Sequence, residues 1–159
     1  MTWLCGNAPA GAYDSPMSMN LRALADRIGD FLIRMDVDTE RTDEGIFFFK
    51  HGSTVVMMSI FEQDGHRWVR FVATMLADVH PSMDLLGRLL RLNTEVLLGA
   101  FLLFEDGTLA FSHTLLGDHL DFEEFEYALH YVAQVGDDYD EELQAVAGGL
   151  RAEEILRGD

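Results

Sequence analysis

The chain has 159 residues, the size of one domain. Its 28 acidic residues outnumber 11 Lys and Arg, and the net charge of −17 argues against direct binding of nucleic acid, because phosphates would be repelled. Its longest apolar runs, such as residues 96–104, are about half the roughly 20 residues that a membrane-spanning helix needs. The single cysteine and the absence of Lys and Arg from residues 1–20 predict a cytoplasmic protein without disulfide or signal peptide.

The first predicted element is an amphipathic helix that follows an irregular segment. Residues 1–17 contain two of the three prolines and no hydrophobic period, which predicts a flexible N-terminal arm. Apolar residues then recur every three or four positions from Leu21 to Met35. With Ser18 or Asn20 as its N-cap, this pattern predicts a helix that ends near Met35.

Three β-rich runs come next, at residues 46–50, 53–63 and 66–76. They are separated by the turn pairs His51-Gly52 and Asp64-Gly65. Asp-Gly between apolar β-formers is a strong hairpin signal, so the pattern predicts three antiparallel strands in meander order.

Helical spacing returns at residues 82–95, which predicts a second helix. Two further apolar runs, at residues 97–104 and 108–116, flank the turn at residues 105–107 and predict a second hairpin. A long third helix is expected from residue 122 onward. Asp121 with Glu124 three positions later forms an acidic version of the capping box at its start.

The resulting element order is α-β-β-β-α-β-β-α, and the predicted fold class is α+β, with helices packed against an antiparallel five-stranded sheet. Gly148-Gly149 is expected to end the third helix, because glycine supplies the left-handed residue that helix ends favour. We therefore expect one domain over residues 18–149 and a charged C-terminal tail over residues 150–159.

The second predicted strand is apolar on both of its faces, which a sheet with one wet face would not show. Three helices can cover one face of five strands but hardly two, so the surplus apolar surface predicts a subunit interface or a partner site. We assign partner binding to one face of this strand, at Val56, Met58 and Ile60. In the alternative, the helices divide between the two faces and bury both in a monomer.

Negative charge is concentrated near the C-terminus, since residues 118–159 carry a net charge of −11 and residues 1–117 carry −6. An acidic helix can steer a basic partner, including a protein that itself handles nucleic acid. We assign this role to Glu126, Asp137 and Asp138. The alternative is that the charge serves solubility alone.

The chain carries no recognisable catalytic motif. No serine lies in a Gly-x-Ser-x-Gly turn, and the single lysine does not follow a glycine-rich phosphate loop. We therefore expect neither a catalytic residue, nor a metal, nor a cofactor. The competing interpretation is a metal-dependent enzyme, and its candidate ligands are His113, His119, Asp121 and Glu123.

The passage from residue 90 to 109, LRLNTEVLLGAFLLFEDGTL, followed by FSHTL at 111–115, resembles the YbjN family. Its most specific features are Asn93, Gly99 and the Asp106-Gly107 turn, and the resemblance covers residues 18–149. YbjN proteins share the fold of type III secretion chaperones.

This resemblance implies a non-enzymatic domain, chaperone-like or regulatory, that binds segments of other proteins on apolar surface and forms a homodimer. In secretion chaperones the dimer forms around the second helix and the neighbouring hairpin. Carried onto this chain, the expected dimer interface contains Leu86, Leu90, Asn93 and Phe101. The family has no catalytic residues to carry over.

Overall fold

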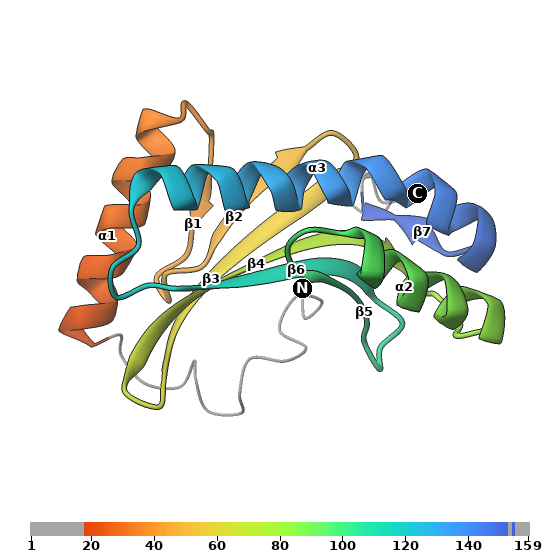
Figure 1. Cartoon of the computed structure of the whole chain (residues 1–159). Coiled ribbons are helices and arrows are strands. Elements are labelled where there is room, and N and C mark those ends of the chain that lie inside the picture. The colour runs from red at the N-terminus through yellow and green to blue at the C-terminus, as the bar shows by residue number, and fades with distance from the viewer. Residues whose placement is uncertain (1–17, 153, 155–159) are drawn as a thin grey trace.

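The structure is a computed structural model that describes residues 18–152 and 154, and in this part of the chain three helices lie over one face of an antiparallel sheet (Figure 1). The α+β prediction is confirmed. The expected N-terminal arm, residues 1–17, and most of the expected C-terminal tail lie outside the described residues. The helices are α1 (Met19–Arg34), α2 (Met83–Glu95) and α3 (Phe122–Ala147).

The ends of the helices are set by local hydrogen bonds that the sequence signals indicated. Ser18, Ser82 and Asp121 are the N-caps, and each side chain accepts a hydrogen bond from the backbone N–H three residues later, at 3.3, 3.1 and 2.8 Å. At the other end of α3, Gly148 has a φ of 68° and donates its N–H to the Gln144 carbonyl at 2.8 Å. The predicted glycine stop is therefore confirmed.

The sheet is fully antiparallel, with the order β1-β2-β3-β4-β6-β5, and β7 pairs with the end of β4. The described strands are β1 (Glu40–Arg41), β2 (Phe47–His51), β3 (Thr54–Gln63), β4 (His66–Ala77), β5 (Ala100–Leu103), β6 (Leu109–Leu116) and β7 (Leu150–Arg151).

The structure adds two strands to the predicted five and shortens one of them. β1 and β7 have two residues each, too few to show any hydrophobic period, and β7 begins the segment that was predicted to be a tail. β5 starts at Ala100 rather than at Leu97 because Gly99 turns the chain with a φ of 74°. A Cβ at Gly99 would lie 2.4 Å from the Ser112 carbonyl oxygen, so this close approach requires glycine.

The main core lies between the helices and one face of the sheet. Phe71 of β4, Phe111 of β6 and Phe125 of α3 are fully buried there, and the ring centroids of Phe71 and Phe125 are 5.6 Å apart. All three helices contribute to this one core, so they do not divide between the two faces. A second apolar cluster lies on the opposite face and contains Ile46, Met57, Val72 and Ala110.

The long α3 crosses the sheet at Gly136, where helix and strand come unusually close. A Cβ at this position would lie 2.7 Å from the Ala73 Cβ and 3.3 Å from the Thr54 Cγ2. Glycine therefore weakens the helix locally but lets it approach the sheet. Gly29 of α1 offers a matched comparison, since a Cβ there would meet no atom within 4 Å.

Gly136→Ala is expected to lower the free energy of unfolding by about 1–2 kcal/mol, because overpacking outweighs the roughly 1 kcal/mol that alanine gains over glycine in a helix. Gly29→Ala meets no clash and is expected to raise the free energy of unfolding by up to about 1 kcal/mol. Urea denaturation of both variants measures the difference. Equal stabilisation by both changes would contradict the close packing of α3.

Candidate functional site

An apolar stripe is exposed on the outer side of α2. Met83, Leu86 and Leu90 follow one another at intervals of three and four residues, which places them on one side of the helix, and Leu97 lies two residues beyond the helix end at Glu95. They are 84%, 37%, 70% and 73% exposed, while the opposite side of α2 is buried in the core. We call these four residues the α2 surface. Isolated exposed leucines are ordinary, but an aligned set of this size is typical of an interaction surface.

The α2 surface continues onto α3 through two tyrosines. The hydroxyl oxygen of Tyr131 accepts a hydrogen bond from the Leu97 N–H at 2.8 Å. Tyr127 stacks on Tyr131 with ring centroids 6.1 Å apart and is itself half-exposed. Met83, Leu97 and Tyr127 were not predicted as interface residues, although the spacing of Met83 with Leu86 and Leu90 was a readable signal in the sequence.

The four residues expected in the dimer interface fall into two groups. Leu86 and Leu90 belong to the exposed α2 surface, but Asn93 and Phe101 hold the fold together. Asn93 Oδ1 accepts from the Phe101 N–H at 2.6 Å, and Asn93 Nδ2 donates to the Phe101 carbonyl at 3.2 Å. Because β5 is an edge strand of the sheet, this side chain satisfies backbone groups that another chain could otherwise pair with.

The face of the sheet opposite the helices is a second candidate surface. Phe48, Met57 and Val72 lie opposite one another on β2, β3 and β4, and therefore on one face. We call this the helix-free face, and by register it includes Phe48, Lys50, Val55, Met57, Phe61, Trp68, Arg70 and Val72. Its apolar cluster accounts for the second apolar side of β3.

The partner-binding residues assigned to β3 lie on the wrong side for that role. Val56 and Met58 are completely buried under the helices, and Ile60 is 6% exposed in the same core. A partner could reach them only by displacing a helix. The alternate residues of the same strand, Val55 and Met57, are the ones that face away from the helices. The apolar pattern revealed both faces, but the position of the helices decides which one is core.

The helix-free face carries little negative charge, unlike the rest of the protein. Arg70 donates from Nε to the Thr114 Oγ1 at 3.3 Å, and its guanidinium lies 5.0 Å from the centre of the Phe61 ring. By register, Lys50 is on the same face, and Glu40 is at its β1 edge. This surface therefore suits apolar chain segments, including those with a weak negative charge.

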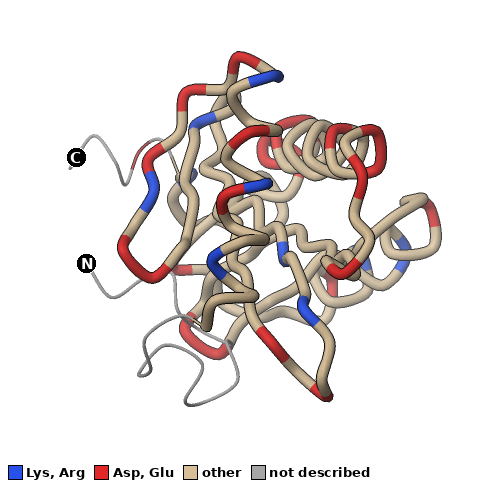
Figure 2. Tube along the Cα trace, turned by 90° about the vertical axis from the view of Figure 1, so that its left-hand side faces the viewer, with Lys and Arg blue, Asp and Glu red and all other residues tan. Residues whose placement is uncertain are grey.

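The acidic residues expected to bind a partner have different roles in α3. Asp138 is exposed and accepts from Gln134 Nε2 at 2.7 Å, and Glu126 is partly exposed. Asp137 instead holds the β2–β3 turn, where its Oδ1 accepts from the Ser53 N–H at 2.8 Å. That backbone hydrogen bond lowers the pKa of the Asp137 carboxyl. Figure 2 shows how acidic positions recur along the chain while basic ones are few.

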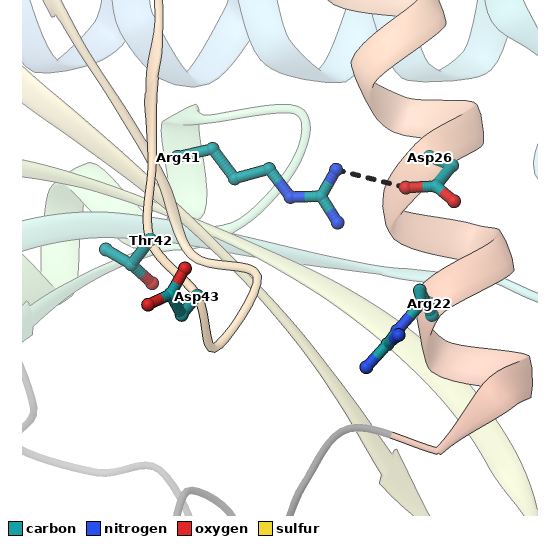
Figure 3. A pocket seen from close by; sticks show the side chains of 5 residues that line it. All are labelled: Arg22, Asp26, Arg41, Thr42 and Asp43. Atoms are coloured by element: carbon teal, nitrogen blue, oxygen red, sulfur yellow. Dashed lines mark hydrogen bonds and ion pairs between the residues drawn. The ribbon is translucent and has the colours of Figure 1, made fainter.

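A small polar cavity of about 470 Å³ lies between α1 and the β1–β2 connection. Arg41 crosses it to pair with Asp26 at 3.1 Å, and Arg22, Thr42 and Asp43 complete the lining (Figure 3). Cofactor sites are mostly apolar with a few polar groups. This cavity has the opposite character, because charged residues that largely neutralise each other dominate its lining.

The candidate metal ligands are not assembled into a site. Within residues 18–152 and 154, no group of three or more His, Cys, Asp or Glu side chains could hold a metal ion. Asp121 is occupied as the N-cap of α3, and His113 points from β6 toward the helix side, where burial lowers its pKa. The geometry therefore offers no support for the metal-dependent alternative.

Asp118 ties the start of β4 to the β6–α3 connection. It accepts from Arg67 Nε at 2.6 Å and lies 2.9 Å from His66 Nδ1. The hydrogen bonds from His66 and Arg67 lower the pKa of the Asp118 carboxyl from 3.8 to about 2. A carboxyl whose pKa is lowered by folding stabilises the protein above its ordinary pKa and loses that contribution as the pH falls.

The free energy of unfolding is therefore expected to fall as the pH drops from about 4 to about 2, and Asp118→Asn is expected to remove the share that this carboxyl contributes. Urea denaturation at a series of pH values, with both proteins, measures that share as the difference between the two curves. Parallel curves across this range would contradict the assignment.

The comparisons with known proteins support a binding role. In the part of the chain described here, no helix is long and apolar enough to cross a membrane. No curated protein matches the sequence. A chain in the crystal structure of the ExsC–ExsE complex superposes with a TM-score of 0.61 at 16% identity, covering 80% of this chain and 97% of that one.

The structure of YbjN, a putative transcription regulator from E. coli, superposes with a TM-score of 0.56 at 13% identity, covering 74% of this chain and 92% of that one. At such identities these likenesses establish the fold. The family described as T3SS (YopN, CesT) and YbjN peptide-binding chaperone 1 matches residues 21–155. The chain therefore belongs to this family, TY-Chap1, as the resemblance in its sequence indicated.

Proposed function

We propose that the protein is a non-enzymatic, chaperone-like module that binds a segment of a partner protein on the helix-free face. The observation that carries this proposal is an apolar cluster, centred on Met57 and Val72, on a face over which no described helix lies. A soluble domain gains nothing from such a surface unless something covers it. Membership of a peptide-binding family supports a polypeptide as the ligand, and the chain of related fold in the ExsC–ExsE structure comes from a complex of two proteins.

A homodimer formed through the α2 surface is the second part of the proposal. Leu86 and Leu90 are exposed on one side of α2, and Tyr127 extends the apolar area onto α3. Self-association would remove these side chains from water. The helix-free face and the α2 surface are distinct, so a dimer of this kind leaves the peptide site accessible. We expect the protein to act in the cytoplasm.

Captured partners are the direct test of the peptide site. The protein, carrying an affinity tag, is used to capture partners from its native cell, in parallel with the Met57→Lys variant. A bound protein that is lost with Met57→Lys but kept with Ile33→Lys, which adds the same charge at an exposed position of α1 outside both surfaces, supports the site. Equal capture by all three proteins would exclude the helix-free face.

We further propose that the partner is basic and is attracted by the acidic residues of α3. Asp138 and Glu126 carry charge at the surface without being needed for the turn that Asp137 holds. The association rate is expected to fall by at least about tenfold between 10 mM and 150 mM salt, because screening shortens the range of the attraction. The double variant Asp138→Asn, Glu126→Gln should weaken this dependence, as measured by stopped-flow mixing with the captured partner. A rate that does not respond to salt would exclude steering.

A further inference from the structure

The polar cavity between α1 and the β1–β2 connection is lined by two charged side chains that are not paired. Arg22 lies on α1 and Asp43 on the facing connection (Figure 3). Neither side chain makes a hydrogen bond or an ion pair with any residue that the structure describes. A guanidinium and a carboxylate that line one cavity without pairing can both be satisfied by a ligand that carries both charges.

A closed turn holds the wall of the cavity that carries Asp43. The Thr42 N–H donates to the Ile46 carbonyl at 2.9 Å, and the Gly45 N–H donates to the Thr42 carbonyl at 3.0 Å. The Ile46 N–H donates in turn to Thr42 Oγ1 at 3.3 Å. Gly45 has a φ of 79°, a left-handed conformation that glycine adopts without strain. The backbone at Asp43 is therefore held in place without any ligand.

The Arg41–Asp26 ion pair completes the cavity and keeps part of its hydrogen-bonding capacity. Arg41 Nη1 donates to Asp26 Oδ1 at 3.1 Å, and the guanidinium lies 5.3 Å from the centre of the Phe47 ring. The two side chains are still 37% and 64% exposed. A guanidinium has several N–H donors and a carboxylate has several lone pairs, so one mutual bond leaves both groups able to bind more. A side-chain amide can accept from Arg41 and donate to Asp26.

The balance of charge in the cavity disfavours simple ions as ligands. Arg22 and Arg41 face Asp26 and Asp43, so an anion would meet two carboxylates and a cation would meet two guanidinium groups. The net charge of −17 also repels anions. A molecule with one charge of each sign leaves no charge opposed. The cavity of about 470 Å³ lies within the roughly 300–1,000 Å³ of small-molecule sites.

We propose that this cavity binds a free α-amino acid with an amide side chain, glutamine or asparagine. The ligand carboxylate pairs with Arg22, its ammonium group pairs with Asp43, and its amide bonds to Asp26 and Arg41. By register Arg41 is opposite Phe47, a residue of the main core, so the site is on the helix side of the sheet. The site is therefore separate from the helix-free face, and it does not depend on the proposed binding of a partner segment.

Calorimetric titration of the full chain with L-glutamine and with L-asparagine tests the site. We expect saturable binding of at least one of them. Glutaramic acid, which is glutamine without its ammonium group, and 4-aminobutanamide, which is glutamine without its carboxylate, are expected to bind at least about tenfold more weakly than glutamine or asparagine. Saturable binding of neither amino acid up to about 10 mM, which would nearly fill a site of millimolar affinity, would overturn the proposal. Equal binding of the two analogues would overturn it as well.

Variants of the two unpaired side chains locate the binding. Arg22→Gln and Asp43→Asn are each expected to weaken binding of the better amino acid by at least about tenfold. Arg91→Gln and Asp138→Asn make the same changes at exposed positions outside the cavity and are expected to leave the affinity unchanged. Circular dichroism checks that all four variants are folded. The same affinity in the cavity variants as in the controls would overturn the assignment, and the capture experiment with a partner is unaffected by either result.

Discussion

Met58→Lys is expected to unfold the protein, whereas Met57→Lys is expected to leave it folded. Met58 is completely buried under the helices, and its lysine would be a buried charge without a partner. An uncompensated buried charge costs about 3–5 kcal/mol, in addition to the lost packing, against a total stability of about 5–15 kcal/mol for a domain. A loss of that size leaves little or no folded protein.

The neighbouring side chain points to the other face, where the cost is much smaller. Met57 is only 8% exposed, so its replacement also loses packing, but a lysine there can extend its charged end past the apolar cluster to water, and we expect a loss of about 1–2 kcal/mol, well below the loss at position 58. Circular dichroism and urea denaturation of the two variants provide the comparison. An equally large loss at both positions would show that the helix-free face is as much a part of the core as the helix side.

The same two variants also distinguish an effect on folding from an effect on binding. Met57→Lys keeps the fold and is expected to lose the partner segment, because an inserted charge would have to be desolvated when the segment binds. A folded Met57→Lys protein that still binds its partner with unchanged affinity would exclude this face as the site. The two adjacent methionines thus distinguish the side of the strand that packs in the core from the side that we propose binds the partner.

Leu90→Asp is expected to convert the proposed dimer into a monomer. Leu90 is at the centre of the α2 surface and is 70% exposed, so the change should not disturb the fold of the free chain. A charge at the centre of an apolar interface costs about 2 kcal/mol or more, which weakens association by at least about 30-fold. Sedimentation of the full chain over a range of concentrations measures the shift in mass.

Ile33→Asp provides the matched control. Ile33 on α1 is 78% exposed and lies outside the α2 surface, so an aspartate there should leave the mass unchanged. A protein that is monomeric at all concentrations before any substitution would exclude the dimer. A Leu90→Asp protein that still has the mass of a dimer would exclude this surface as its interface.

The elements of the fold were largely predictable because their signals are local. Ser82 and Asp121 cap the helices that follow them, and Gly148 ends the last one, each through hydrogen bonds within a few residues. Asp64-Gly65 closes the β3–β4 hairpin in the register that the apolar runs required. The two-residue strands β1 and β7 could not be predicted, because their pairing depends on neighbours distant in sequence.

The surfaces proposed for binding were predictable in kind but not in place. The exposed leucines of α2 could be named from the family resemblance, and Leu86 and Leu90 are indeed at the surface. Asn93 and Phe101 looked equivalent in sequence, yet they close the edge of β5. Asp137 likewise resembled its neighbour Asp138, and only the approach of the β2–β3 turn gives it a structural partner.

By itself, the sequence determined the α+β class, the order of the main elements, the excess of acid near the C-terminus and the presence of more apolar surface than three helices can bury. The tertiary structure alone decided which side of each strand the helices cover. The physical reason is that β3 is apolar on both sides, so its own pattern fits either orientation. Contacts between residues that are distant in sequence, such as the close approach of Gly136 on α3 to Ala73 on β4, place the helices on one side of the sheet. Met57 is left on the other side.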